Sequence, residues 1–400
     1  MIMKDCTVKI DMNSQPTILY FGNDWSAENR TSSHHIARRL IKHYRVIYVE
    51  CPGLRAPKGN ARDIKKIFSK LSKCLGRPRP IDERSYVYTL FQIPFHRFAL
   101  IRKLNRWLIV RSLRSLCRKL KIQQPILWFV LPHLAMVLGR LDESFAVYYC
   151  TDDYSSMPGV NRDMIQEMDH QMTEKCDVVF CSAQPLVDSK KMFADKVHLS
   201  RHGVDFDHFH QVQSASLVIA KDVASLKHPV IGFFGLMENW VDLGMVRYAA
   251  QKRPDWTFLM IGRLAVEHNP CQGLANVHFI GSRPYEVLPS YAKVFDAAVI
   301  PCVTNELIYN FNPLKLREYL AMGKPIVSTA YPEVEVFKDI VEIAHSKEEF
   351  VEKIEHALKT DNPEKMRMRI DSVRDWSWDH RFEDVISTVN KYFEKKQGSQ

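Results

Sequence analysis

The sequence predicts an α/β protein built from two Rossmann-like domains, because strand-like and helix-like segments alternate along the whole chain. In the first half, five short apolar runs are typical of buried strands, at residues 17–22, 46–50, 126–131, 146–150 and 178–182. A second series begins near Pro229, with the runs VIGFF, WTFLMI, VHFI, DAAVIP and PIVST. Because 400 residues are too many for one ordinary core, we expect two domains that face each other across a cleft.

One segment of the chain indicates where the first domain ends. The segment RHGVDFDHF (residues 201–209) separates the two series, so we expect the first domain to cover residues 1–205. In parallel α/β folds, ligands bind at the carboxyl ends of strands. The functional site is therefore expected between the two domains.

Composition places the chain among globular proteins of the cytoplasm. It is 46% hydrophobic and 26% charged, without any run of 18 apolar residues that would predict a membrane-spanning helix. Residues 1–15 lack the apolar core of a signal peptide. The nine cysteines form no C-x-x-C pair, which favours reduced thiols over a disulfide framework or a zinc site.

The positive charge is concentrated in one part of the chain. Residues 51–121 contain 19 Lys and Arg against three acids, a balance of +16, so the rest of the chain carries about −6 of the net +10. Residues 93–122 mix nine of these cations with Phe and Trp and contain no acid, a pattern typical of an interfacial helix on anionic lipid. A core helix with a solvated basic side is the structural alternative. No recognised nucleic-acid module accompanies the charge, so nucleic acid is not an expected partner.

The segment NPLKLREYLAMGKPIVST (residues 312–329) predicts a helix followed by a buried strand. Asn312 suits the N-cap of this helix and Pro313 its first position. Gly323 is expected to end the helix in a left-handed conformation.

Lys315 lies in the first turn of the predicted helix, where the helix dipole makes a cation unfavourable by about 0.3–1 kcal/mol. Free N–H groups and a lysine at that end make an anion site, such as one for a diphosphate. Glu318 can face the same site, and its carboxylate would accept hydrogen bonds from a ribose diol. A capped helix with solvated charges is the alternative reading.

A second candidate site follows the run AVYYC, where the sequence continues TDDY. Asp152 and Asp153 are adjacent carboxylates beside an apolar strand, and such a pair can raise one another's pKa, which suits a general base. In the alternative reading, Asp153 caps the turn that leads into SSMPG.

Five motifs in order, over residues 18–380, resemble glycosyltransferases of the GT-B fold: HGVD (202–205), GFFGLMENW (232–240), NVHFIGSRPYEVLPSY (276–291), NPLKLREYLAMGKPIV (312–327) and SWDHR (377–381). The similarity is greatest to the family-four group that builds bacterial surface polysaccharides, including teichuronic-acid-type enzymes, and extends to membrane-associated glucuronosyltransferases. It implies a donor domain at residues 206–375. It also implies a C-terminal helix at residues 376–400 that packs back on the first domain.

The resemblance further implies an activity. The expected enzyme is a metal-independent hexosyl- or hexuronosyltransferase without a cofactor, which moves a sugar from a nucleotide-sugar co-substrate, UDP-linked in our expectation, to a lipid-linked saccharide. It would work at the inner face of the cell membrane as a peripheral protein, with residues 51–121 against the anionic surface. The alternatives are a nucleotide-sugar epimerase and a catalytically silent polysaccharide- or membrane-binding protein.

The residues that the resemblance assigns fall into three sets. Asp152, Asp153 and Lys315 are the candidate catalytic residues, with an Asp as base. Gly22, Asp24, Arg30 and His35 are expected on the acceptor side, although a histidine at a helix start is commonly a cap partner. The expected donor-binding residues, with Ser282 and Arg283 at the edge of the base, are Gly235, Met237, Ser282, Arg283, Tyr285, Asn312, Pro313, Leu314, Lys315 and Glu318.

The chain also departs from the family-four pattern. Asn310 stands where the first of two spaced glutamates is usual, and residues 236–240 lack the usual Arg and Lys after the glycine loop. Lys315 must then supply most of the positive charge, and the stereochemical outcome of transfer stays open.

Overall fold

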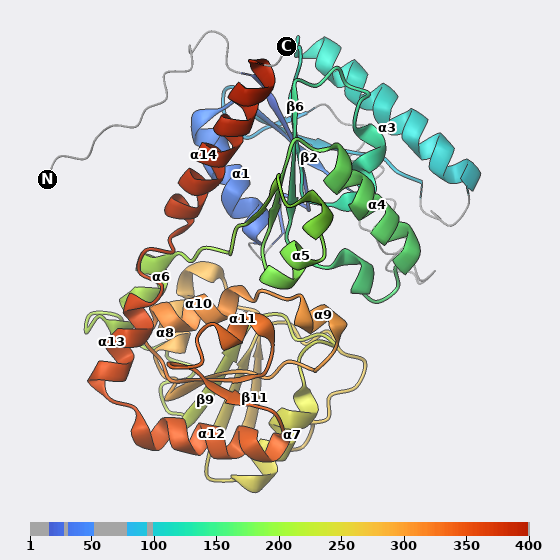
Figure 1. Ribbon diagram of the computed structural model, residues 1–400. Coiled ribbons are helices and arrows are strands. Elements are labelled where there is room, and N and C mark those ends of the chain that lie inside the picture. Colours follow the sequence, from blue (N-terminus) through green and yellow to red (C-terminus); the bar gives the residue numbers. More distant parts are fainter. Residues whose placement is uncertain (1–15, 28–30, 52–77, 94–98, 399–400) are drawn as a thin grey trace, which may run out of the picture. The chain divides into compact units, whose positions relative to one another are not determined.

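A computed structural model describes residues 16–27, 31–51, 78–93 and 99–398 (Figure 1). The chain forms two compact units. Unit 1 comprises Met1–Cys181, Lys190–His198 and Val385–Gln400, and unit 2 comprises Ser182–Ser189 and Leu199–Asp384. Each unit has its own sheet, as the alternating pattern of the sequence predicts.

Unit 1 contains an eight-stranded sheet in the order β3-β4-β2-β1-β5-β6-β7-β8. Its strands are β1 (Ile18–Gly22), β2 (Val46–Glu50), β3 (Arg79–Pro80), β4 (Tyr86–Thr89), β5 (Ile126–Phe129), β6 (Phe145–Cys150), β7 (Val178–Cys181) and β8 (Val197–Leu199). The five apolar runs of the first half are all strands and are fully buried, and β3 alone pairs in antiparallel fashion. The sequence does not predict β3, β4 and β8, which are short; β3 is exposed, and β4 and β8 are only partly buried.

The helices of unit 1 are amphipathic and lie against this sheet (Figure 1). They are α1 (Ser32–His43), α3 (Ala99–Lys119), α4 (Arg162–Lys175) and the last part of α14 (Trp378–Gln397), with 3-10 turns at Pro132–Val137, Tyr154–Ser156 and Lys191–Phe193. Thr31 and His34 form a capping box at the start of α1, and the Asn161 side chain accepts from the Met164 N–H at the start of α4.

Helix α3 contains most of the basic segment that the structure describes. Ile109, Leu113 and Leu116 are its buried side, while Asn105 bonds to both the N–H and the carbonyl of Ile93 at 2.8 and 2.9 Å. In the part of the chain with described coordinates, no helix is long and apolar enough to cross a membrane. Most of the earlier basic run, residues 52–77, lies outside the described residues.

Unit 2 contains a six-stranded sheet in the order β11-β10-β9-β12-β13-β14, and its neighbouring strands run parallel. The strands are β9 (Val230–Phe234), β10 (Thr257–Ile261), β11 (Val277–Gly281), β12 (Ala297–Ile300), β13 (Ile326–Thr329) and β14 (Glu342–Ala344). The helices are α5 (Gln184–Asp188), α6 (Phe206–His210), α7 (Leu243–Lys252), α8 (Leu288–Ala292), α9 (Glu306–Tyr309), α10 (Leu314–Ala321), α11 (Pro332–Glu335), α12 (Lys347–Thr360) and α13 (Pro363–Asp371).

Both faces of the unit 2 sheet are buried. Phe233 and Met260 point into one hydrophobic cluster, whereas their chain neighbours Phe234 and Leu259 point into another. Alternate residues of a strand face opposite sides, so a sheet covered on both sides needs continuous apolar runs. The runs VIGFF and TFLMI meet this requirement.

The chain passes from unit 1 to unit 2 at Leu199, earlier than the expected boundary after Asp205. The reason is packing: Val204 is buried and forms a parallel bridge with Ser377, and Gly203 lies against Trp378. The return to unit 1 falls at Val385, inside α14, later than the expected residue 376.

The end of α14 packs on unit 1, as the resemblance implies. The Phe393 ring lies 5.5 Å from that of Phe145 with edge-on geometry, and Lys396 Nζ lies 2.9 Å from a carboxylate oxygen of Asp177. These contacts tie α14 to the starts of β6 and β7.

Gly232 in β9 provides a test of how tightly unit 2 packs. A Cβ at this position would lie 2.2 Å from the Phe295 ring, so Gly232→Ala should destabilise the protein by about 1–3 kcal/mol through overpacking. Gly398→Ala, where the nearest atom would lie 3.5 Å away, is the matched control. Urea unfolding measures both, and equal midpoints for the two variants would contradict the packing described.

Candidate functional site

Lys315, in the first turn of α10, lies directly across the glycine loop that follows β9. Gly235 has φ +140°, and a Cβ there would lie 2.0 Å from Lys315 Cε and 2.6 Å from its Nζ. Lys315 Nζ also lies 5.5 Å from the centre of the Phe233 ring. A side chain at position 235 would displace the flexible end of Lys315, and the positive φ independently favours glycine there. The structure thus brings together Lys315 and Gly235, two of the residues predicted for the donor site.

Lys315 and Glu318 share one half-buried environment. Burial lowers the pKa of the Lys315 ammonium, and the charges of Glu318 and Cys302 oppose that effect. Burial raises the pKa of Glu318 to about 7; Lys315 counteracts the shift and Asp205 adds to it. In the protein without a ligand, burial thus disfavours the charged forms of both Lys315 and Glu318. Shifted pKa values of this kind are typical of functional sites.

Asp205 is a residue of this site to which the sequence analysis gives no role. It accepts a hydrogen bond from Tyr285 Oη at 2.8 Å, and the Tyr285 ring stacks on His208 at 4.7 Å. Asp205 is the last residue of the HGVD motif, which indicates the domain boundary and the family resemblance but no role for this side chain. Its proximity to Glu318 arises from packing between α6 and α10 and has no local signal in the sequence.

Asn312 is not the N-cap of α10, contrary to the expectation. Pro313 occupies that position, and the Asn312 side chain instead donates to the Ser182 carbonyl and accepts from Arg317 Nη1. Asn312 is buried, whereas Leu314, the first residue of α10, is half-buried. Gly323 has φ +68° just after the helix, as predicted.

Arg317 is fully buried and serves the structure of unit 2. Its Nη2 lies 3.7 Å from Glu333 Oε2, and Glu333 also accepts from Arg201 Nε at 2.9 Å and from the Gln184 N–H at 3.1 Å. Burial lowers the pKa of Arg317 to about 10, against the opposing effect of Glu333, so the guanidinium keeps its charge at neutral pH. This network anchors the start of α10 to the segments around residues 182–184 and 201.

The loop after β11 is held by its own side chains. The Arg283 guanidinium donates to Asp222 Oδ2 at 3.0 Å, to Tyr291 Oη at 2.8 Å and to the Ile280 carbonyl, while Ser282 is exposed. The contact of Ser282 and Arg283 with a base stays a prediction.

The Met237 side chain is completely buried. Its N–H bonds to the Arg263 carbonyl at 3.0 Å, and its carbonyl accepts from the Ala265 N–H at 2.8 Å. Met237 thus fixes the shape of the glycine loop, and a ligand could reach only its main chain.

The acceptor-side residues predicted in unit 1 lie at the end of β1 and the start of α1. A Cβ on Gly22 would lie 2.3 Å from Tyr48 Oη, so glycine is needed there. Asp24 caps Ser26 through its side chain, and its carbonyl lies 2.9 Å from His34 Nε2. His35 is buried within α1, and Arg30 lies outside the described residues.

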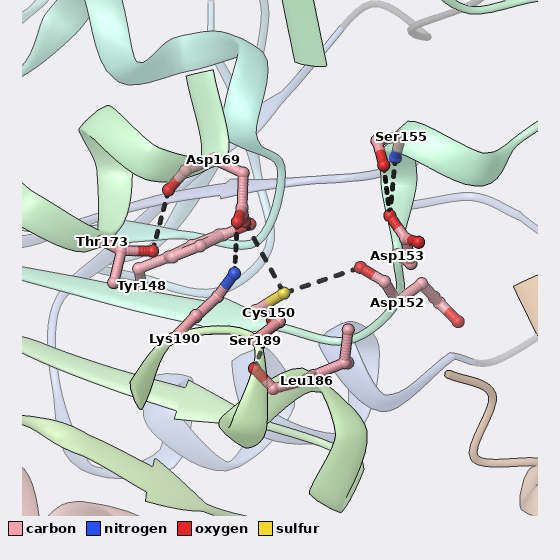
Figure 2. Close-up of polar contacts among 10 residues, drawn as sticks. All are labelled: Tyr148, Cys150, Asp152, Asp153, Ser155, Asp169, Thr173, Leu186, Ser189 and Lys190. Atoms are coloured by element: carbon pink, nitrogen blue, oxygen red, sulfur yellow. Dashed lines mark hydrogen bonds and ion pairs between the residues drawn. The ribbon is translucent and has the colours of Figure 1, made fainter. Parts of the chain in front are cut away.

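The two adjacent aspartates after β6 have different environments. Asp153 caps the following turn, accepting from the Ser155 N–H at 3.0 Å and from the Ser155 hydroxyl at 2.6 Å (Figure 2). It also accepts from the Ser156 hydroxyl at 2.6 Å. The carboxylate of Asp152 accepts from Thr151 Oγ1 at 3.3 Å. Burial raises the pKa of Asp152 to about 7; the Thr151 hydroxyl lowers it and Asp153 raises it. Asp152 therefore has the properties of a general base, and its role in catalysis stays a prediction.

Two parallel-sheet units of this kind are the GT-B fold of glycosyltransferases, and comparisons with known proteins agree. Residues 228–360 match the family model "Glycosyl transferases group 1". The chain is 27% identical over 279 residues to the putative teichuronic acid biosynthesis glycosyltransferase TuaH of Bacillus subtilis strain 168, covering 63% of this chain and 68% of that protein. This chain therefore has a GT-B fold and contains a glycosyltransferase group 1 domain.

Solved structures share this fold at low sequence identity. The trehalose-6-phosphate synthase of Burkholderia multivorans superposes with a TM-score of 0.66 at 11% identity, over 94% of this chain and 98% of that one. Anabaena Alr3699/HepE, solved with UDP and glucose, gives 0.62 at 11% identity, over 93% and 99% of the two chains. At such identities the likeness concerns the fold alone.

The raised pKa of Asp152 predicts a pH-dependent gain in stability for Asp152→Asn. The folded protein keeps the proton up to about pH 7, whereas the unfolded carboxyl releases it near 3.8, so stability is lost as the pH rises through this window. Asparagine carries no charge, so the variant should be more stable than wild type at pH 8 and almost equally stable below pH 4. The full shift would correspond to about 4 kcal/mol at pH 8, and because Asp152 is only half-buried we expect about 2–4 kcal/mol.

Urea unfolding of both proteins at the two pH values measures this difference. Asp153→Ala is the control, and it should lower stability because it removes the hydrogen bonds that cap the turn. A gain for Asp152→Asn that is equal at both pH values would contradict a raised pKa of the half-buried Asp152.

Proposed function

We propose that this protein transfers a sugar from a UDP-sugar to a lipid-linked saccharide during synthesis of a bacterial surface polysaccharide, without a metal ion. The observation that carries the proposal is the placement of Lys315 across Gly235 and beside Glu318, within the group 1 domain. A half-buried ammonium at a helix N-terminus is unfavourable unless an anion binds it. A nucleoside diphosphate supplies that anion.

The donor site divides into two parts of opposite charge. When the glycosidic bond to the diphosphate breaks, negative charge develops on the leaving oxygen, and Lys315 and the N–H groups at the start of α10 would stabilise it. The Gly235 N–H, expected from the sequence to contribute, instead donates to the Ile261 carbonyl at 2.8 Å. Glu318 would accept hydrogen bonds from the ribose hydroxyls. Binding the diphosphate beside Lys315 would also favour the charged form of that side chain, whose pKa burial lowers in the free protein.

Two relatives support the choice of donor and product class. The structure of Anabaena Alr3699/HepE contains UDP and glucose, and the TuaH protein of Bacillus subtilis is named for teichuronic acid biosynthesis. We carry both properties over to this chain as part of the proposal.

The proposal assigns the proton acceptor to unit 1. Asp152 would take the proton of the acceptor hydroxyl as that oxygen bonds to the anomeric carbon. A base works best when its pKa lies near the working pH, and burial brings Asp152 to about 7. Asp153 would support this step indirectly, by holding the turn that follows Asp152.

Helix α3 supports the proposed work at the inner face of the cell membrane. Its exposed side begins with apolar residues, Leu100 at 81% and Trp107 at 57% exposure. It continues with cations that line a groove of about 1150 Å³: Lys103, Arg106, Arg111, Arg114, Arg118 and, from outside the helix, Arg140. Apolar anchors beside a cluster of arginines suit an anionic lipid surface.

Transferase activity with a Lys315→Ala variant tests the proposed function. UDP release from a panel of UDP-sugars, with lipid extract as acceptor source, should fall about 100- to 1000-fold because the charge on the leaving group loses its partner. The control is Lys338→Ala, which removes an exposed lysine from the same unit. Turnover by wild type that Lys315→Ala leaves intact would refute the assigned site.

Flotation with liposomes tests the membrane surface. Replacing Arg111, Arg114 and Arg118 by Gln should weaken binding to vesicles of anionic lipid by about 1 kcal/mol per charge removed, and added salt should weaken wild-type binding. A variant that loses Lys252, Lys338 and Lys347 from unit 2 has the same net charge and should bind like wild type. Equal loss in both variants would contradict a surface on α3.

A further inference from the structure

A partly buried cluster of polar side chains lies beside Asp152 in unit 1, centred on the carboxylate of Asp169 in α4 (Figure 2). Three donors converge on it. Tyr148 Oη donates at 2.6 Å, Cys150 Sγ lies 3.9 Å away, and Lys190 Nζ forms an ion pair with the second oxygen. The Asp169 carbonyl also accepts from Thr173 Oγ1 at 2.8 Å, one turn further along α4.

The cluster shields a charged pair in part from water, with the Asp169 side chain 27% exposed. Lys190 is only 6% exposed, and Tyr148 and Cys150 are buried in β6. Burial lowers the pKa of Lys190, but Cys150 and Asp169 outweigh that effect and raise it above its ordinary value, so the ammonium stays charged. A buried ion pair commonly adds little net stability compared with apolar side chains of similar volume, which leaves positioning as its main contribution.

The cluster contacts the end of β6, the strand that leads to Asp152. Tyr148 and Cys150 are two residues apart in β6, so they face the same side of the sheet, and both reach Asp169. The Cys150 thiol also lies 3.5 Å from the main-chain carbonyl of Asp152. Cys150 thus contacts both the Asp169 carboxylate and the main chain of Asp152, and its one S–H proton is donated to one of these acceptors at a time.

The Asp152 side chain depends on its main chain for its position. Among the described residues, its carboxylate receives one hydrogen bond, from Thr151 Oγ1, and that hydroxyl pairs with Tyr154 Oη at 2.7 Å. Asp153 and Tyr154 are the titratable groups that follow it in the turn, and Cys150 is the one before it. A shift of the strand end would therefore move Asp152 directly.

We propose that Asp169, paired with Lys190 and acting through Tyr148 and Cys150, is a positioning residue that fixes the orientation of the half-buried Asp152 side chain. The proposal rests on the proposed function, in which Asp152 is the base. It assigns Asp169 and Lys190 no contact with substrate.

The double variant Asp169→Asn/Lys190→Met tests this role. Both charges are removed together because removing one alone would leave the other buried and unpaired, which destabilises strongly. We expect kcat to fall about 10- to 100-fold with an unchanged KM for the donor, since a small displacement of a catalytic group has effects of that size. The acid limb of the pH profile should move to lower pH, because a loosened Asp152 gains water and its pKa falls.

A matched control lies at the opposite end of the same strand. Asp177 accepts from the Ala146 N–H at 2.8 Å and pairs with Lys396 at 2.9 Å, so Asp177→Asn/Lys396→Met removes a similar aspartate–lysine pair at the start of β6. It should change the melting temperature but neither kcat nor the pH profile. A purely structural role for Asp169 would make the two double variants alike.

A second readout separates this proposal from the proposed function. The pKa of Asp152 can be followed in the protein alone by NMR of ¹³C-labelled aspartate, with Asp152→Asn for assignment. We expect the Asp152 midpoint in the Asp169→Asn/Lys190→Met variant to be lower than in wild type by about one pH unit or more. A shifted midpoint in a protein without transferase activity would support the positioning role and refute the proposed function. An unshifted midpoint in a folded variant would overturn the positioning role, whatever the activity.

Discussion

The donor site depends on one contact, the passage of the Lys315 side chain across Gly235. A Cβ on Gly235 would lie 2.0 Å from Lys315 Cε, so the loop after β9 and the first turn of α10 pack directly against each other. A neighbouring glycine, Gly262, has φ +136° and leaves no room for a Cβ against the Gly235 carbonyl. The backbone is shaped to admit an ammonium group, and the ammonium is half-buried with Glu318 as its charged neighbour. An anionic ligand is the natural complement of that arrangement.

The chain treats buried charge in two ways. Arg317 is surrounded by Asn312 and Glu333, and Lys190 is paired with Asp169; these groups keep their charges and hold elements in place. Lys315, Glu318 and Asp152 have fewer partners, and burial moves the pKa of each toward its neutral form. Groups whose charged form is disfavoured in this second way are commonly the ones that bind a ligand or transfer a proton.

Local signals in the sequence predict much of the fold. The continuous apolar runs give the central strands of both sheets, since a strand buried on both faces needs no polar positions. Gly323 has the left-handed conformation expected after a helix. Lys315 was identified from an unfavourable position in the first turn, which is also a local argument. Short edge strands such as β3 and β14 have no such pattern.

The sequence does not predict contacts between residues that are far apart along the chain. The N-cap prediction for Asn312 is wrong because Arg317 and the Ser182 carbonyl, 130 positions away, bind its side chain. The pairing of Asp169 with Lys190 and the approach of Asp205 to Glu318 likewise result from packing between elements. The sequence also does not predict that the Arg283 side chain donates hydrogen bonds to Asp222 and Tyr291.

The most direct test of this account is a binding isotherm for each of UDP, GDP, ADP, CMP and dTDP with the purified protein, without sugar or acceptor. We expect UDP to bind. At about 100 times its Kd, UDP should stabilise the folded state by about 2.7 kcal/mol. We also expect that Lys315→Ala loses this binding. No binding of any of the five nucleotides would contradict the site at Lys315 and Glu318, and would favour a GT-B protein that binds membrane or polysaccharide without turnover.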